Sequence, residues 1–101
     1  MYKRQENISA QEVEDVLYRH AKVGDVTVIG LPDPRTGERA CAVVQLADGV
    51  TELTLAELAD HCRAEGLAIQ KVPEQLELVD ALPRNSMGKV LKQDLRARYR
   101  P

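Results

Sequence analysis

The chain has 101 residues, of which 44% are hydrophobic, so we expect one domain with a modest core. Three Tyr are the only aromatic residues and the formal charge is −2, which argues against an aromatic-lined pocket and against a general nucleic-acid binder. No apolar run approaches membrane-spanning length and no signal-peptide pattern is present, so we expect no transmembrane segment and a cytoplasmic protein. Cys41 and Cys62 are too few and too far apart for a disulfide scaffold and are expected to be reduced and buried.

The first predicted element is an amphipathic helix. Ser9 to Glu12 has the form of a capping box, in which a Ser side chain and a Glu side chain three residues later satisfy free backbone N–H groups. Val13, Val16 and Leu17 then follow at helical spacing. The pattern predicts a helix from about Ala10 to Ala21.

Two β-branched runs come next, VTVIGL at 26–31 and ACAVVQL at 40–46, separated by the turn-rich segment PDPRTGER. They predict two strands joined by a turn. Both runs are apolar at successive positions, so we expect the sheet to be covered on more than one face.

A second capping box spans Thr54 to Glu57 and predicts another amphipathic helix, with Gly66 as its stop. The segment EQLELVDAL at 74–82 predicts a third strand, with Leu76 and Leu78 on one face. A turn and a basic terminal helix follow. This order predicts an α+β fold, a small three-stranded sheet with helices packed against it in a single domain.

Several chemical signals in the sequence do not predict a site. His20 and His61 are expected on helices and have no partner at metal-ligand spacing, so no metal site is predicted. Cys62 follows His61 directly, and neighbouring helix positions point in different directions, so the two cannot act as nucleophile and base. A phosphate-binding P-loop ending at Gly88-Lys89 is excluded because it needs a glycine at position 83 and Ser or Thr at position 90.

The segment PRNSMGK, residues 83–89, is predicted to form a turn that places one lysine, Lys89, just before the final basic helix. A solvated cation at a helix start is the simplest interpretation of Lys89. Two further hypotheses stay open. In the first, the chain is an independent module that binds an anionic cofactor through Lys89, Lys92 and the terminal arginines. In the second, it is a structural domain that docks a partner.

The tail LPRNSMGKVLK, residues 82–92, resembles the last signature motif of the adenylate-forming enzymes, which in their acyl-CoA synthetases commonly reads L-P-R-T-x-x-G-K-x-x-[KR]. Upstream segments agree in order along nearly the whole chain. ENI at 6–8 with EVE at 12–14 is similar to the family's G-G-E-N-I and E-[VI]-E, DVTVIGLPD at 25–33 to D-V-A-V-[IV]-G-x-P-D, and KVP at 71–73 to Y-K-x-P.

The resemblance implies that residues 1–101 are the small C-terminal lid of such an enzyme, with the hinge and the large N-terminal adenylation domain absent. The intact enzymes join an acid to ATP, with Mg²⁺, and then transfer the acyl group to CoA. Lys89 matches the lysine that enters the active site in the first half-reaction, where an ammonium group offsets the repulsion between carboxylate and α-phosphate. Small Ser86 and Gly88 are expected to let this loop extend between the domains and to contact the cofactor there.

For the second half-reaction, the resemblance implies that the lid rotates and presents the loop of residues 4–8, which contains Glu6 and Asn7, to CoA. The two glycines of the family motif are replaced here, and Met1–Gln5 is expected to be a truncation or an expression scar rather than family sequence. Lys71 is a further candidate for contact with CoA or the partner domain.

The resemblance leaves the substrate open. An adenylation domain that serves a carrier protein is the nearest alternative, although GLPDPRTGERACAVV is more similar to fatty or alicyclic acid–CoA ligases. Pro83, four residues, then Gly88-Lys89 also fits the spacing that protein lysine acetyltransferases recognise in related ligases, and acylation would remove the charge of Lys89.

Overall fold

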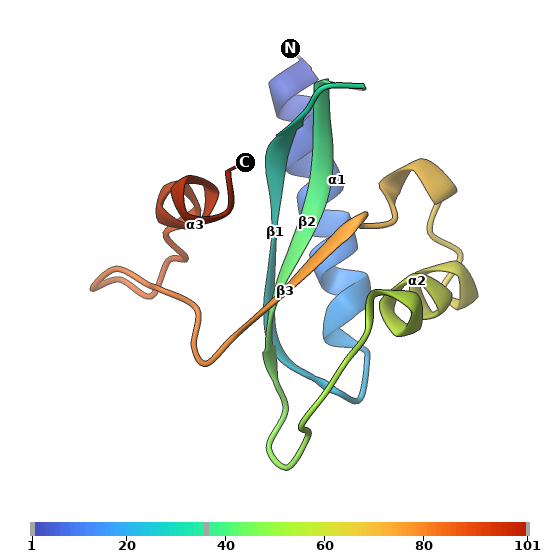
Figure 1. The fold of residues 1–101 in the computed structure, drawn as a ribbon, viewed down its shortest axis with the longest axis vertical. Coiled ribbons are helices and arrows are strands. Elements are labelled where there is room, and N and C mark those ends of the chain that lie inside the picture. The colour runs from blue at the N-terminus through green and yellow to red at the C-terminus, as the bar shows by residue number, and fades with distance from the viewer. Residues whose placement is uncertain (1, 36, 101) are drawn as a thin grey trace.

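The computed structural model of the chain describes residues 2–35 and 37–100, with side chains from residue 10 onward within these ranges. The predicted α+β fold is confirmed as a three-stranded mixed sheet flanked by helices (Figure 1). The elements in chain order are α1 (Tyr2–Tyr18), β1 (Val23–Asp33), β2 (Gly37–Leu46), α2 (Leu55–Ala64), the 3-10 helix η1 (Ile69–Lys71), β3 (Gln75–Val79) and α3 (Lys92–Tyr99). Within the described ranges no helix is both long and apolar enough to span a membrane.

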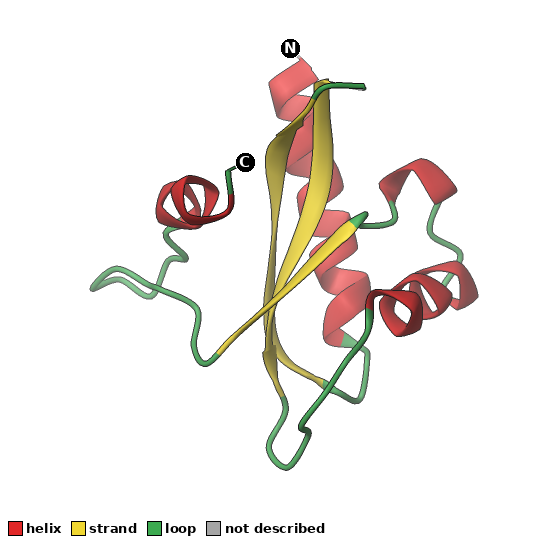
Figure 2. Cartoon of the chain, in the orientation of Figure 1, coloured by secondary structure: helices red, strands yellow, loops and turns green. Residues whose placement is uncertain are grey.

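The sheet has the order β1-β2-β3, so β2 is central and β1 is an edge strand (Figure 2). β1 and β2, the two strands predicted to be joined by a turn, pair antiparallel, with Val28 opposite Ala42. β3 runs parallel to β2, with Leu78 opposite Val44, and α2 and η1 lie in the connection between these strands. A register shift between Val23 and Asp25 marks a bulge near the start of β1.

Both faces of the sheet are buried along the central residues of β1 and β2, as the continuous apolar runs predict. In Figure 1, α1 and α2 lie on one side of the sheet and α3 on the other. The first core lies between the sheet and α1 and α2, and its buried members include Val13, Leu17, Val28, Val44, Leu58 and Cys62. The second core lies under α3 and consists of Ile29, Leu31, Cys41, Val43, Leu82 and Leu95. Adjacent residues such as Val28 and Ile29 thus belong to different cores, because side chains of a strand alternate between its faces.

The two cysteines are free and buried, as predicted. Burial raises the pKa of the Cys41 thiol to about 12, and burial also raises the pKa of Cys62. Both therefore stay as neutral thiols at physiological pH and act as small apolar side chains.

The bounds predicted for the first helix are wrong at both ends. α1 begins at Tyr2 rather than Ala10, so the Ser9 capping box lies inside the helix and residues 4–8, expected as a loop, have helical backbone. No Gly or Pro interrupts residues 2–9, so nothing in the local sequence forces the helix to start at Ser9. The helix ends at Tyr18, and the following backbone turns, with the His20 N–H donating to the Leu17 carbonyl oxygen at 3.0 Å. His20 therefore lies beyond the helix on which it was expected.

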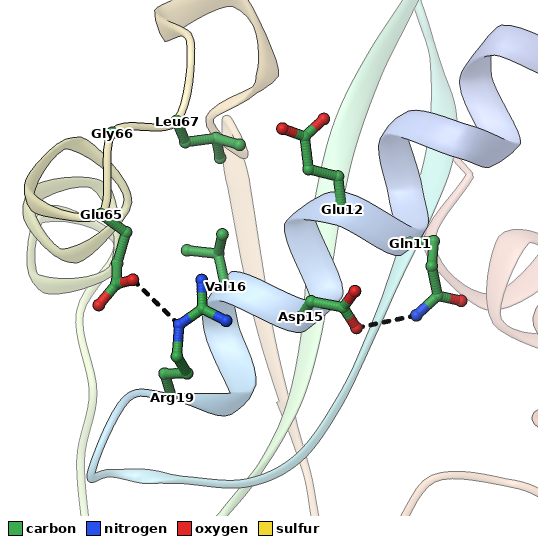
Figure 3. Close-up of a pocket in the computed structure, with 8 residues that line it drawn as sticks. All are labelled: Gln11, Glu12, Asp15, Val16, Arg19, Glu65, Gly66 and Leu67. Carbon is green, nitrogen blue, oxygen red and sulfur yellow. Dashed lines mark hydrogen bonds and ion pairs between the residues drawn. The ribbon is translucent and has the colours of Figure 1, made fainter.

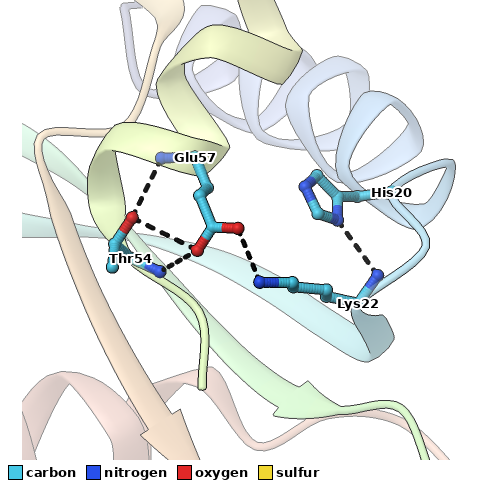
Figure 4. A network of polar contacts seen from close by, with 4 residues as sticks. All are labelled: His20, Lys22, Thr54 and Glu57. Carbon is cyan, nitrogen blue, oxygen red and sulfur yellow. Dashed lines mark hydrogen bonds and ion pairs between the residues drawn. The ribbon is translucent and has the colours of Figure 1, made fainter. Parts of the chain in front are cut away.

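The second capping box is confirmed, and it also fastens α2 to the rest of the domain (Figure 4). The Glu57 N–H donates to the Thr54 hydroxyl at 3.1 Å, and the Thr54 N–H donates to the Glu57 carboxylate at 3.0 Å. The same carboxylate accepts from the Lys22 ammonium at 2.6 Å. Gly66 follows the last turn with a φ of 86°, a backbone conformation that favours glycine at a helix end.

β3 is shorter than predicted, because it covers residues 75–79 rather than 74–82. Its last paired residue, Val79, lies opposite Gln45, and β2 ends one residue later, so there is no strand for a longer β3 to pair with. The chain then leaves the sheet, and Leu82 packs in the second core. This exit leads directly into the loop that holds Lys89.

Candidate active site

The loop between β3 and α3 is a tight turn built around Asn85. The Asn85 side-chain oxygen accepts from the Met87 N–H at 2.9 Å and from the Lys89 N–H at 3.0 Å. The Asn85 N–H donates to the Lys89 carbonyl oxygen at 2.9 Å, and the Gly88 N–H donates to the Asn85 carbonyl oxygen at 2.9 Å. An isolated antiparallel bridge between Arg84 and Val90 closes the base of the turn. The backbone of Lys89 is therefore fixed while its side chain is exposed.

The conformation of the turn explains why position 88 is a glycine, and it places Ser86 at the surface. Gly88 has a φ of 84°, in the left-handed region that other residues rarely adopt, so glycine is needed here for the backbone conformation. A Cβ on Gly88 would meet no atom within 4 Å, so the constraint is torsional rather than steric. Ser86 lies exposed at the tip of the turn. Their predicted contact with a cofactor stays a prediction.

Arg84 braces the turn from its side. One guanidinium nitrogen of Arg84 donates to the Gly88 carbonyl oxygen at 2.6 Å, and the other donates to the Asp25 carboxylate at 2.6 Å. The Tyr18 hydroxyl donates to the second oxygen of Asp25 at 2.5 Å. We refer to Tyr18, Asp25 and Arg84 as the bracing network. It joins the end of α1, the start of β1 and the Lys89 loop.

The contacts within the bracing network favour an ionised Asp25 carboxylate beside a charged Arg84 guanidinium group. Burial opposes ionisation of Asp25, but the hydrogen bonds from Tyr18 and Arg84 outweigh it, so the pKa of Asp25 lies below its ordinary value of 3.8. The hydrogen bond to Asp25 raises the pKa of Arg84. Burial, followed by the hydrogen bond to Asp25, raises the pKa of Tyr18 above 10.0. At neutral pH the network therefore contains an ionised carboxylate, a guanidinium and a neutral phenol.

A groove runs beside this loop along the free edge of β1. It has a volume of about 620 Å³ and is lined by α1, β1 and the segment from Arg84 to Asp94, with Lys89 among its lining residues. Glu14 closes one part of it: its carboxylate accepts from the Val28 N–H at 2.7 Å and lies 3.2 Å from the Lys92 ammonium. Lys89 itself takes part in none of the ion pairs formed among the described side chains. The groove thus presents one exposed ammonium group that is open to an anionic ligand.

Lys71 lies at a different place. Its ammonium pairs with the Glu12 carboxylate at 2.7 Å, and Glu12 lines a second groove between α1 and the end of α2 (Figure 3). In that groove Arg19 is paired with Glu65 at 2.9 Å, and the Gln11 amide donates to Asp15 at 2.9 Å. Lys71 and Lys89 therefore belong to separate surfaces, and the proposed contact of Lys71 with CoA stays a prediction. The side chains of Glu6 and Asn7 lie outside the part of the chain that the structure describes.

The two histidines have structural partners. His61 Nε2 donates to the Val16 carbonyl oxygen at 2.7 Å, and the Lys22 N–H donates to His20 Nδ1 at 3.0 Å. The two rings meet edge to face, with centroids 4.9 Å apart. The described residues contain no group of three or more His, Cys, Asp or Glu side chains that could hold a metal ion.

The residues that hold Lys89 in place could not be identified from the sequence alone. Asn85 carries the one usable signal, because an Asn side chain in a turn often accepts from the backbone N–H two residues ahead of it. Asp25 and Tyr18 gave no local signal, because their contact with Arg84 joins segments 59 residues apart. Only the fold brings these residues together.

Comparison with known proteins assigns the chain to a family. Residues 12–89 match the family described as AMP-binding enzyme C-terminal domain. The chain belongs to this family. The match ends at Lys89, and it contains the bracing network and the Asn85 turn.

Relatives within this family have different activities by name. Pyochelin synthase PchD from Pseudomonas aeruginosa is 44% identical over 96 residues, covering 94% of this chain and 17% of PchD. Medium-chain fatty-acid–CoA ligase from Escherichia coli is 41% identical over 91 residues, covering 90% of this chain and 16% of the ligase. The solved structure of Mycobacterium tuberculosis fatty acyl CoA synthetase superposes with a TM-score of 0.80 at 37% identity, covering 89% of this chain and 17% of the synthetase. The chain thus spans about a sixth of the length of these relatives, and it is a C-terminal domain of the adenylate-forming, ATP-using enzymes.

Proposed function

We propose that this domain is the lid of an AMP-forming acid–CoA ligase and that Lys89 is its catalytic residue. In this proposal a large adenylation domain binds ATP, Mg²⁺ and the carboxylic acid, and this C-terminal domain closes over them. The observation that carries the proposal is the geometry of the Lys89 loop. Its backbone is held by Asn85 and Arg84, while its ammonium group is exposed beside an open groove.

The chemistry of adenylation explains why such a lysine is useful. Attack of a carboxylate on the α-phosphate of ATP forms the acyl–phosphate bond and breaks the bond to pyrophosphate, and it brings two anions together. An ammonium group that contacts both the carboxylate and the phosphate oxygens offsets this repulsion as charge develops on the phosphate. A prepositioned lysine also avoids the entropic cost of ordering a flexible loop during the reaction.

In the second half-reaction the CoA thiol attacks the carbonyl carbon of the acyl-adenylate and AMP leaves. We assign no role to Lys89 in this step, because the phosphate charge that it would stabilise belongs to the first step. Glu6, Asn7 and Lys71 remain the proposed contacts for CoA. CoA as the acceptor is favoured by the relatives named as CoA ligase and acyl CoA synthetase. A carrier protein is the alternative acceptor, and the pyochelin synthase relative keeps it open.

The experiment compares Lys89→Ala with the unchanged domain, joined to or mixed with its adenylating large domain. Pyrophosphate release is measured separately from thioester formation that starts from preformed acyl-adenylate. We expect Lys89→Ala to lower the rate of pyrophosphate release by about a hundredfold, the usual effect of losing one charge-stabilising contact. Thioester formation is expected to change little. Arg63→Ala is the matched control, because Arg63 is an exposed cation on α2 paired with Asp60.

Equal loss of both half-reactions in Lys89→Ala would contradict the proposal, and so would full activity. Offering CoA and a carrier protein in parallel identifies the acceptor. Acylation of Lys89 by a protein lysine acetyltransferase is part of the same proposal, since its exposed side chain is accessible to another enzyme. Mass spectrometry of the protein from its native host tests this point, and the absence of any acylated Lys89 peptide would contradict it.

A further inference from the structure

We propose that Asp25 is a positioning residue for Lys89, acting through Arg84. The inference rests on the proposed function of Lys89, because a positioned lysine needs a role to serve. The bracing network is the structural basis: Asp25 anchors Arg84, Arg84 holds the Gly88 carbonyl group, and Gly88 directly precedes Lys89.

Arg84 is suited to this task because its guanidinium group makes two contacts in different directions. One contact is a hydrogen bond to backbone at Gly88 and the other is an ion pair with Asp25, each 2.6 Å long. A lysine at position 84 would keep the charge but would lack the planar fork that reaches both acceptors at once. The contact with Gly88 thus depends on where Asp25 holds the guanidinium group.

Asp25 is itself held firmly. One of its oxygens accepts from the Tyr18 hydroxyl and from the Val26 N–H, at 2.5 Å and 2.9 Å, and the other accepts from Arg84. Tyr18 is the last residue of α1, and Asp25 follows the bulge in β1. The carboxylate therefore transmits the position of α1 and β1 to the Lys89 loop.

An ordinary surface ion pair would not position a loop, because such pairs contribute little and are easily replaced by water. The Asp25–Arg84 pair differs in three respects. The Asp25 side chain is only 22% exposed, its carboxylate accepts three hydrogen bonds, and Arg84 also binds the backbone of the loop. The Arg63–Asp60 pair on α2, with side chains 56% and 78% exposed, is the ordinary kind and serves as a control.

The first test is structural and uses the 101-residue chain by itself. Backbone amide exchange and ¹⁵N relaxation are measured by NMR for Met87 and Lys89 in the unchanged chain, Asp25→Asn, Arg84→Lys and the control Asp60→Asn. Both variants weaken the charge-assisted hydrogen bond from Arg84 to the Gly88 carbonyl oxygen, which holds the loop backbone. We therefore expect the Met87 and Lys89 amides to exchange about tenfold faster in both variants. Asp60→Asn is expected to match the unchanged chain. Unchanged exchange in both network variants would overturn the proposal.

The second test is kinetic and uses the domain with its adenylating large domain. We expect Asp25→Asn to lower kcat for pyrophosphate release by about tenfold, with KM for the acid little changed, because the lysine is misplaced rather than removed. Thioester formation from preformed adenylate is expected to be spared. A general loss of stability would slow both half-reactions instead. Arg84→Lys guards against a folding defect specific to Asp25→Asn, because it leaves the bond from Tyr18 to Asp25 in place.

The outcomes separate this proposal from the one on which it rests. If Lys89→Ala slows pyrophosphate release but neither Asp25→Asn nor Arg84→Lys does so, Lys89 is catalytic and the positioning role of Asp25 is wrong. If Lys89→Ala is fully active, the proposed function fails, and the positioning role fails with it whatever the NMR data show. If all three variants slow the same half-reaction and the loop amides exchange faster in the network variants, both proposals are supported.

Discussion

Asn85 binds both backbone polar groups of Lys89. The Lys89 N–H donates to the Asn85 side chain at 3.0 Å, and the Lys89 carbonyl oxygen accepts from the Asn85 N–H at 2.9 Å. The side chain of the proposed catalytic residue is therefore exposed on a backbone that hydrogen bonds hold in place. Changes to Asn85 separate these two properties.

Replacing Asn85 with Ala removes the acceptor for two amides of the turn, those of Met87 and Lys89. We expect a loss of about 1 kcal/mol in the free energy of unfolding, in line with the loss of a small number of exposed side-chain hydrogen bonds. We also expect pyrophosphate release to slow while thioester formation is spared. Urea denaturation and the half-reaction assays measure the two effects. Asn85→Asp keeps the acceptor, and a defect as large as that of Asn85→Ala would contradict this account.

Gly88 offers a test of the turn that changes no hydrogen-bonding group. Gly88→Ala is expected to destabilise the domain by about 1–2 kcal/mol, because its φ of 84° is strained for a residue with a Cβ. A Cβ at this position meets no neighbour, so the cost is torsional. Gly88→Asn is expected to cost less, since Asn adopts positive φ more readily. Urea denaturation decides the order, and equal stability of the Ala variant and the unchanged chain would show that the turn differs from the one described.

The capping box of α2 predicts a local stability effect. Thr54→Ala removes the hydroxyl that accepts from the Glu57 N–H, and we expect a loss of about 1 kcal/mol in the free energy of unfolding. Thr54→Ser keeps the hydroxyl and is expected to retain most of that stability. Thermal and urea denaturation measure both variants. A loss in Thr54→Ser equal to that in Thr54→Ala would point to the methyl group instead of the cap.

The lowered pKa of His20 leads us to expect that the stability of the domain depends on pH near neutrality. Burial and the nearby His61 lower the pKa of His20 below 6.5, against an opposing effect of Glu57, while Lys22 adds to the lowering. The unfolded chain therefore binds a proton more readily than the folded one, so stability falls as the pH drops below 6.5 and levels off below the folded pKa. Urea denaturation at pH 7.5 and pH 5.5 measures the difference. His20→Gln is expected to reduce the slope, and an unchanged slope would assign it to other groups.

The local signals of the sequence account for much of the fold. The capping box at Thr54 is found where it was predicted, because both of its partners lie within one turn. The equivalent signal at Ser9 failed, because the preceding residues can continue the helix and capping only selects a start where they cannot. The continuous apolar runs of β1 and β2 correctly predicted that both faces are covered.

The candidate site also contains one residue that the sequence identifies and others that only the fold reveals. Lys89 was found from its motif, but its supports were not, because the contact between Asp25 and Arg84 depends on the path of the whole chain between them. Nothing near Asp25 in sequence indicates a partner at position 84. Asn85 could be expected in a turn, but its two bonds to Lys89 depend on the conformation of Gly88, which composition alone does not specify.

The position of Leu95 has a consequence for the movement of Lys89 that the proposed function implies. Leu95 is fully buried in the second core, only six residues after Lys89, and Leu82 enters the same core seven residues before it. The residues at both ends of the loop are thus buried in the second core. Moving the loop without the rest of the domain would expose other residues of this core, such as Ile29 and Val43, to solvent. Under the proposed function, we therefore expect the sheet and the Lys89 loop to move together as one body when the ammonium group is brought to a reaction centre.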